Sequence, residues 1–261
     1  MSDMDRRKFL KIAGISALLG MGSWSLFEVV TKEHLEAFVE KYKTPPEAMH
    51  AKRWAIVIDL KKLDEKIMHD CIEACNRIHN VPQISNPKEE IKWIWKETFE
   101  HAFPGMEHQY MPEEIKEMPV LVLCNHCDSP PCVRVCPTKA TFKRKDGIVM
   151  MDMHRCIGCR FCMAACPFGA RSFNWRDPRP FIKEENKEYP TRMRGVVEKC
   201  TLCCERLEVG LPPACVEVSN GAIMYGDLAD PNSEIRKLLA TRYSIRRKAE
   251  LGTNPCVYYL L

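Results

Sequence analysis

The sequence of 261 residues predicts an α+β fold preceded by an N-terminal hydrophobic helix, and three observations support this prediction. Short apolar runs of strand length alternate with stretches of helical apolar spacing. Cysteine is unusually abundant, at 15 residues, and is concentrated in closely spaced runs. An uncharged apolar stretch follows a pair of arginines near the N-terminus.

The composition excludes several classes of protein. Charged residues make up 28% of the chain and hydrophobic residues 46%, which excludes a disordered chain and a polytopic membrane protein. The net charge of +4 is too small to indicate nucleic-acid binding. The number of cysteines is odd and the chain is far longer than small disulfide scaffolds, so most cysteines are expected to be ligands rather than disulfide partners.

Residues 1–30 are predicted to be an export signal. Arg6 and Arg7 precede an apolar run over residues 12–27, which is the pattern of a twin-arginine (Tat) signal. No small-x-small cleavage site follows, and residues 29–30 extend the apolar run. We therefore expect an uncleaved membrane anchor and a location on the extracytoplasmic (periplasmic) face of the cytoplasmic membrane. The alternative is a basic amphipathic helix on the protein surface.

The remaining elements follow from local patterns. Residues 31–43 have the apolar spacing of an amphipathic helix, and residues 64–79 predict a second helix that carries Cys71 and Cys75. The other predicted elements are strands at 54–59, 119–123 and 147–152, a short helix at 231–243 and a tail at 254–261.

The most specific signal is the run Cys156, Cys159, Cys162 and Cys166, followed by Pro167. Its spacing is that of bacterial ferredoxins, in which three thiolates of a tight loop bind one [4Fe–4S] cluster and the fourth serves a second cluster. A second run has the same pattern with two residues inserted. Exchange of the fourth cysteines predicts two ligand sets, which are Cys124, Cys127, Cys132 and Cys166 in the first, and Cys156, Cys159, Cys162 and Cys136 in the second.

The outer cysteines predict a third set. Cys200, Cys203 and Cys215 lack a fourth member of their own run, because Ser219 stands at the expected position. The same exchange of ligands supplies Cys75 from the distant helix.

A fourth site is predicted to be lost. It would need Cys71 and Ser219 together with Met68 and either Glu65 or Leu63. Since the missing cysteines all fall in one site, we predict three [4Fe–4S] clusters bound by twelve cysteines, with a four-cluster protein as the alternative.

Three cysteines are then left without a cluster. Cys71 is expected to be a buried relic and Cys256 to be structural or free. Cys204 follows Cys203 directly and could replace it as a ligand. A disulfide between two of these three residues is a further alternative. For the cysteine runs the alternative metal is zinc, although runs of four cysteines do not divide naturally into tetrahedral zinc sites.

The inner pair of runs and the degenerate outer pair together predict tandem bacterial ferredoxin-like modules of the 2[4Fe–4S] type with long loop insertions. The expected organisation is a helical linker at 31–50, the first part of an outer lobe with an insertion at 51–118, an inner lobe with two clusters at 119–184, the closing part of the outer lobe with one cluster at 185–226, and a C-terminal helix and tail at 227–261.

Several residues beside the cysteines have two possible roles. Lys199 and Arg155 precede cluster cysteines and could raise a reduction potential by favouring the more negative reduced cluster, or could be solvated surface charges. His126 could donate a hydrogen bond to a cluster sulfur or could only cover the cluster. The tryptophans Trp54, Trp93, Trp95 and Trp175 are expected in the core or at an interface.

The cysteine motifs resemble those of the electron-transfer subunits of complex iron–sulfur molybdoenzymes and their relatives. The motifs are Cys124-Asn-His-Cys-Asp-Ser-Pro-Pro-Cys, Cys156-Ile-Gly-Cys-Arg-Phe-Cys and Lys199-Cys-Thr-Leu-Cys, and the resemblance runs from Trp54 to the C-terminus. It implies two ferredoxin-like lobes and an electron-transfer role without a substrate site of its own. Members usually hold four clusters, so the missing fourth is a departure. No nucleotide-binding glycine pattern or catalytic triad supports the alternative of an enzyme.

Within this family the chain resembles the exported iron–sulfur subunit of the DsrMKJOP complex (DsrO) and its counterpart in a heterodisulfide-reductase-like, menaquinol-oxidising complex. The cues include residues 75–82, 91–97 and 171–178. This resemblance implies an NrfD-like integral membrane subunit, a multihaem cytochrome c and a role in sulfate respiration. The alternative is an iron–sulfur subunit of a hydrogenase-, polysulfide- or DMSO-reductase-type complex.

Overall fold

Strand β1 (Trp54–Asp59) lies inside the largest sheet of the computed structural model, which describes residues 45–261. It pairs in parallel with β10 (Val257–Leu260) and antiparallel with β8 (Ile223–Asp227), and β9 (Ser244–Ile245) pairs with β10. All six residues of β1 are buried because the strand has neighbours on both edges and packed cores on both faces. Residues 47–261 form one structural unit.

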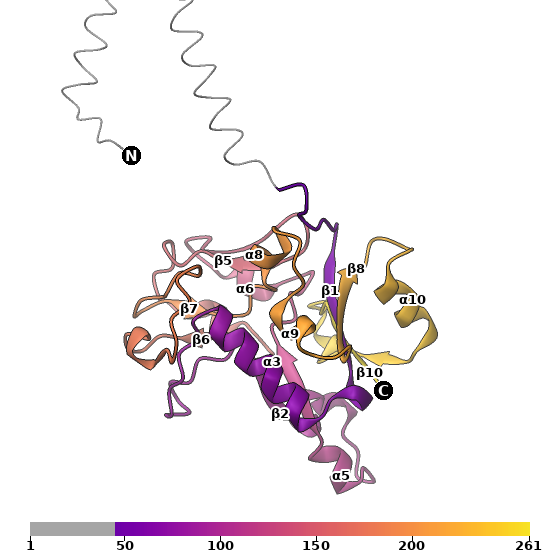
Figure 1. Cartoon of the computed structure of the whole chain (residues 1–261). Helices are drawn as coiled ribbons and strands as arrows, with labels where there is room; N and C mark the ends of the chain where they lie inside the picture. The colour runs from indigo at the N-terminus through magenta and orange to yellow at the C-terminus, as the bar shows by residue number, and fades with distance from the viewer. Residues whose placement is uncertain (1–44) are drawn as a thin grey trace, which may run out of the picture. The chain divides into compact units, whose positions relative to one another are not determined.

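The two faces of β1 enter different cores, as the two-residue period of a strand requires. Ile56 and Ile58 belong to the large central core, whereas Ala55 and Val57 pack against Ile235 of helix α10 (Glu234–Thr241). Helix α10 and β10 therefore lie on one side of the fold, opposite β6 and β7 (Figure 1).

Helix α3 (Glu65–Ile78) carries the first cysteines of the fold. Asp64 caps it by accepting a hydrogen bond from the Ile67 amide at 2.6 Å. Met68, Cys71 and Cys75 form its buried face, at the spacing expected for an amphipathic helix. This face packs on α9 (Ala214–Glu217), 140 residues further along the chain (Figure 1).

The segment without cysteines before residue 119 is an insertion with structure of its own. Strand β2 (Ile94–Thr98) pairs antiparallel with β3 (Pro119–Leu123), so it joins the insertion to the first cysteine run. The short helices α4 (Phe99–Ala102) and α5 (Glu113–Lys116) connect the two strands.

Each complete cysteine run contains a one-turn helix that carries its third cysteine. These helices are α6 (Pro131–Arg134) with Cys132 and α7 (Phe161–Ala164) with Cys162, and α9 holds Cys215 in the same way. Helices α6 and α7 pack on each other as α3 and α9 do. The pair α3–α9 therefore repeats the helix contact of the pair α6–α7.

The remaining elements are short. They are β4 (Thr141–Lys143), β5 (Val149–Met151), β6 (Ser172–Phe173), β7 (Val197–Glu198), α8 (Cys204–Leu207) and the 3-10 helices η1 (Leu60–Lys62), η2 (Pro104–Met106), η3 (Arg179–Phe181) and η4 (Ala249–Leu251). Strand β4 pairs with β5 and β6 pairs with β7, both antiparallel.

The predicted strands at 54–59, 119–123 and 147–152 and the predicted helices at 64–79 and 231–243 are confirmed, with ends shifted by up to three residues. The predicted tail at 254–261 is wrong, because its apolar residues form β10. The predicted export signal, membrane anchor and helix 31–43 lie outside the described residues. Within residues 45–261, no helix is long and apolar enough to cross a membrane.

Candidate metal centre

The structure brings the first predicted ligand set together at the end of β3. Cys127, Cys124 and Cys166 lie in one apolar cluster, with Phe168 and Ala170 beside them. Burial and the neighbouring Cys124, Cys132 and Cys166 thiols raise the pKa of Cys127 to about 12. The four sulfurs therefore come from both inner runs, as the exchange of fourth cysteines predicts.

The second set lies on the other side of the α6–α7 pair. Cys136, Cys156 and Cys162 share an apolar cluster with Val149 and Val197. Cys159 lies in the partly exposed loop that leads into α7. Burial raises the pKa of Cys162, and Cys132 of the first set and Cys156 of its own set raise it further. The first and second sets are therefore neighbours.

The third set is the most deeply buried. Its members are contributed by α3, which carries Cys75, by the loop before α8, which carries Cys200 and Cys203, and by α9, which carries Cys215. All four are buried. Burial and then the Cys200, Cys203 and Cys215 thiols raise the pKa of Cys75 well above its ordinary value. The Cys124 thiol of the first set likewise raises the pKa of Cys200, which shows that the third set lies next to the first.

The chemistry of these donors fits iron–sulfur clusters. Burial and neighbouring thiols raise the pKa of Cys127 and Cys166 of the first set, of Cys162 of the second set and of all four cysteines of the third set. A cationic metal is therefore needed to hold these residues as thiolates. All twelve are free thiols. A buried donor without a partner among residues 45–261 lies beside the first set, at His126 Nε2. The guanidinium of Arg171 interacts with the thiols of Cys132 in the first set and Cys162 in the second. These donors fit the sulfide acceptors of a cluster.

His126 shows this fit at the level of one atom. Its Nδ1 accepts a hydrogen bond from the Val149 amide at 3.1 Å. Burial, and then the charges of Lys199 and Arg171, hold its pKa well below the ordinary value, so the ring is neutral. The single ring proton is then on Nε2, which makes this nitrogen a buried donor.

The residues expected at the lost fourth site are buried and make contacts of their own. Met68 and Cys71 are buried in the central core, and the Cys71 thiol donates to the carbonyl of Cys215 at 3.2 Å. Ser219 accepts from the Ile223 amide at 3.0 Å and donates to the Val216 carbonyl at 2.8 Å. The Ser219 hydroxyl therefore stabilises the turn between α9 and β8.

The two residues proposed for the last ligand position have other contacts. Glu65 forms an ion pair with Lys96 at 2.7 Å, and Leu63 packs against the central core.

The other two leftover cysteines have partners of their own. The Cys204 thiol lies against Glu205 at 3.7 Å, and burial, with Glu205 and Glu208, raises its pKa to about 12 against the opposing effect of Arg144. The Cys256 thiol lies 3.5 Å from a guanidinium nitrogen of Arg53.

The two basic residues singled out in the sequence lie in opposite environments. Lys199 is completely buried, its ammonium donates to the carbonyl of Cys200, and its charge acts on Cys200 and His126. The guanidinium of Arg155 is exposed and pairs with Asp152 at 3.1 Å. Of the two, only Lys199 is placed to influence a cluster strongly, because exposed charges are screened by water.

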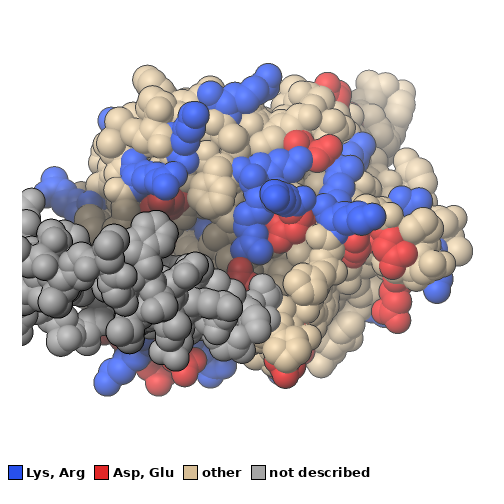
Figure 2. All heavy atoms as spheres, turned by 90° about the horizontal axis from the view of Figure 1, so that it is seen from above, with Lys and Arg blue, Asp and Glu red and all other residues tan. Residues whose placement is uncertain are grey.

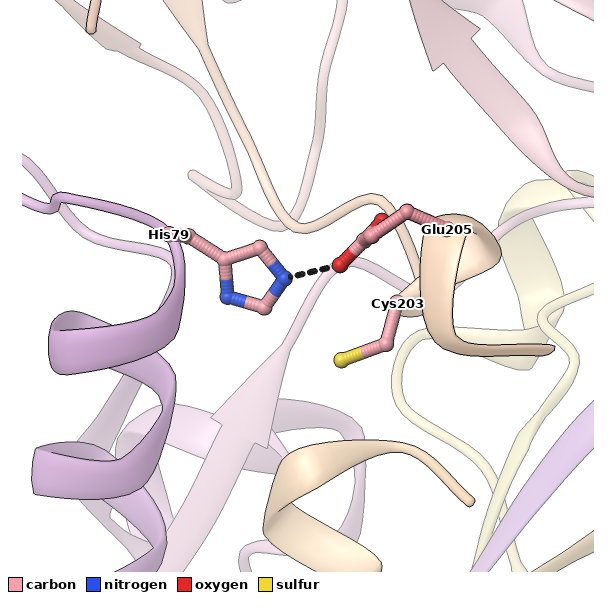
Figure 3. A group of neighbouring side chains, drawn as sticks. All are labelled: His79, Cys203 and Glu205. Atoms are coloured by element: carbon pink, nitrogen blue, oxygen red, sulfur yellow. Dashed lines mark hydrogen bonds and ion pairs between the residues drawn. The ribbon is translucent and has the colours of Figure 1, made fainter. Parts of the chain in front are cut away.

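Sequence reasoning missed His79, which follows α3 and lies beside the third set. Its Nε2 is 2.7 Å from a carboxylate oxygen of Glu205, and Nδ1 is 2.9 Å from the carbonyl of Cys75. Figure 3 shows the ring and the carboxylate pointing at each other next to Cys203. Burial raises the pKa of Glu205, but the hydrogen bond and charge of His79 outweigh it and lower the pKa.

His79, Cys203 and Glu205 are close enough to bind a single metal ion, with ligand atoms within 4.8 Å of one another. Cys203, however, already belongs to the third cysteine set. The pair of His79 and Glu205 is better described as a support that joins α3 to α8 at this site. The position of His79, four residues after Cys75 on the same helical face, is the signal that could have found it.

Comparison with known proteins agrees with this arrangement. Residues 118–179 match the 4Fe-4S dicluster domain family. The chain is 39% identical to Hdr-like menaquinol oxidoreductase iron-sulfur subunit 1 of Archaeoglobus fulgidus, over 98% of this chain and 97% of that one. It is 35% identical to the menaquinone reductase iron-sulfur cluster-binding subunit of Nitratidesulfovibrio vulgaris, over 80% and 88%. It is 36% identical to the arsenate respiratory reductase iron-sulfur subunit of a Shewanella species, over 80% and 96%.

The chain therefore belongs to the family of iron–sulfur subunits of respiratory-type oxidoreductase complexes. The resemblance seen in the sequence to the subunit of a heterodisulfide-reductase-like, menaquinol-oxidising complex is confirmed by the relative from Archaeoglobus fulgidus, which aligns over almost the whole of both chains.

Proposed function

We propose that the protein is an exported electron-transfer subunit of a membrane-bound respiratory complex that uses three [4Fe–4S] clusters. The observation that carries this proposal is the arrangement of the three cysteine sets in series. The first set adjoins the second through Cys132 and Cys162, and adjoins the third through Cys124 and Cys200. Bound clusters would supply one-electron redox chemistry.

The residues of the chain hold and tune this series. Tight loops and one-turn helices fix the thiolates, and the proposed ligands are the twelve cysteines of the three sets. Lys199 places a buried positive charge between the first and third sets, which favours the reduced state there. We propose no fourth cluster, because Met68 and Ser219 provide no thiolate and the Cys71 thiol donates to the carbonyl of Cys215.

The proposed partners follow from the family. An NrfD-like integral membrane subunit that handles menaquinol and a multihaem cytochrome c are proposed on the sequence resemblance, and the names of two relatives contain menaquinol or menaquinone. The chain is proposed to have no substrate site of its own. Export by the Tat route, an uncleaved N-terminal anchor and a place in sulfate respiration belong to the same proposal.

Purification of the complex from native membranes tests the assignment. Co-purification with an NrfD-like subunit and a multihaem cytochrome c is expected, and a molybdopterin or hydrogenase subunit in their place would overturn it. Sequencing the mature N-terminus tests the anchor, since a start near residue 30 would show that the signal is removed.

A further inference from the structure

The second cysteine set is the one closest to solvent. Cys136, Cys156 and Cys159 are partly exposed, whereas every member of the third set is buried. Because electron transfer between proteins requires close approach of the redox centres, the second set marks the end of the series at which a partner protein can exchange electrons.

An apolar surface lies beside this set. Ile157 is 66% exposed and Phe161 is 59% exposed, and both belong to the loop and helix that carry Cys156, Cys159 and Cys162. Trp175, which is 43% exposed, joins them through Arg160, whose guanidinium lies 4.8 Å from the Trp175 ring centroid. We call Ile157, Arg160, Phe161 and Trp175 the Ile157 surface.

The sequence around the Ile157 surface is strongly basic. Residues 129–176 contain nine Lys and Arg and only two Asp and Glu, a net charge of +7 in a chain whose total is +4, so the rest of the chain carries −3. Asp146 pairs with Arg144 and Asp152 pairs with Arg155. Three cations of the stretch pair with acidic residues outside it, Lys143 with Asp128, Arg144 with Glu208 and Arg176 with Glu89. Arg134, Lys139, Lys143 and Lys145 are exposed in the same stretch. Lys and Arg also gather on the face seen from above (Figure 2).

We propose that the Ile157 surface is the docking surface of an acidic redox protein that exchanges electrons at the second cysteine set. This inference rests on the proposed electron-transfer function. The apolar and aromatic side chains form a centre that loses its water on contact. Arg155 and Arg160 of the same loop, and Arg134 of α6, which packs on α7, attract and orient an acidic partner. Arginine and tryptophan are among the residues most often found at such centres.

Oxidation by small cobalt complexes of opposite charge tests the proposal on the full chain. The dithionite-reduced protein is mixed in a stopped-flow instrument with trianionic tris(oxalato)cobaltate(III) or with tricationic tris(phenanthroline)cobalt(III), and the recovery of absorbance near 400 nm is followed at increasing salt. The variant R134E/R155E reverses two exposed charges, on α6 and on the second cysteine loop. The control K61E/K237E makes the same change in net charge on η1 and α10.

For the native protein we expect the rate with the trianion to fall as salt rises. At low salt, R134E/R155E should slow oxidation by the trianion about tenfold and accelerate oxidation by the trication, while K61E/K237E should do neither. Equal effects of the two variants, or equal salt dependence of the two oxidants, would overturn the docking surface. A membrane contact is tested by co-sedimentation with anionic phosphatidylglycerol vesicles. If R134E/R155E alone abolished co-sedimentation and left the oxidation rates unchanged, the docking surface would be overturned in favour of a membrane contact.

Failure of the docking surface can be distinguished from failure of the proposed electron-transfer function. A preparation without absorbance near 400 nm would contradict cluster binding itself. A coloured, reducible protein that fails the charge test contradicts only the docking surface. Iron content equal to that of the native chain is required of each variant, so that a slower rate cannot come from a lost cluster.

Discussion

Gly158 is predicted to be indispensable to the second cluster because its backbone leaves no room for a side chain. It lies between Cys156 and Cys159 with φ of +70°, and a Cβ there would be 2.5 Å from the carbonyl oxygen of Gly195. To restore an ordinary contact of about 3.5 Å, one of the two segments has to move by about 1 Å. The segment that contains Gly195 leads into β7 and Cys200, so the cysteine loop itself is expected to shift.

Gly169 provides a matched control. Its φ is +66°, almost the same as that of Gly158, but no atom lies within 4 Å of the place that a Cβ would take. G169A should therefore lower the free energy of unfolding by about 1–2 kcal/mol, the cost of the left-handed backbone alone. G158A adds the cost of overpacking, for a total of about 2–5 kcal/mol.

The assay is iron and acid-labile sulfide per chain, together with thermal unfolding of the purified proteins. G158A should lose about 4 of about 12 iron atoms, the content of one [4Fe–4S] cluster, whereas G169A should keep them all. Full iron content in G158A with the same melting temperature as G169A would refute the reasoning, since the two variants would then differ in nothing but position.

Three further predictions concern single groups. K199Q should lower the midpoint potential of one or two clusters by on the order of 50–100 mV, because a buried charge is removed, while R155Q should leave the potentials unchanged in a redox titration followed by EPR. C203S should lose one cluster and C204S none by iron analysis; iron loss only in C204S would identify Cys204 as the ligand. R242M should lower the free energy of unfolding at pH 7, because it leaves the Asp59 carboxylate without its partner. Hydrogen bonding from Arg242 lowers the pKa of Asp59, so this stabilisation is present above about pH 4 and lost below it; a difference between R242M and the native chain that is independent of pH would contradict this assignment.

The cysteine spacing predicted most of the candidate site. Runs with fixed short gaps determine which thiols share a loop. The exchange of fourth cysteines groups Cys75 of α3 with Cys200, Cys203 and Cys215, and in the structure these three thiols are close enough to raise the pKa of Cys75. Local spacing is informative here because one tight loop supplies three ligands at once. The same logic assigned Met68, Cys71 and Ser219 to one lost site. In the structure Met68 and Cys71 lie on the buried face of α3, and Ser219 is buried in the turn that follows α9.

Features that depend on tertiary packing could not be predicted in this way. Lys199 and Arg155 both precede a cluster cysteine, yet one is buried and the other is exposed. The difference comes from β7, whose residues lead directly into the core, whereas Arg155 lies in an open turn. The partner of His79, Glu205, is 126 residues away in the sequence, so no local pattern could join them.

The C-terminal segment shows a second limit of local patterns. Residues 257–260 are too few to be distinguished from a tail by composition, and they become a strand because the parallel edge of β1 accepts them. The pairing of β10 with β1, about 200 residues earlier in the chain, depends on the rest of the sheet and not on the composition of residues 257–260.

The iron content of the purified full chain is the most direct measure of how many clusters the protein binds. Three clusters in series predict about 12 iron atoms and about 12 acid-labile sulfides per chain. A value of about 16 would show that a fourth cluster binds where Met68, Cys71 and Ser219 are packed. A colourless protein that contains zinc in place of iron would contradict electron transfer altogether.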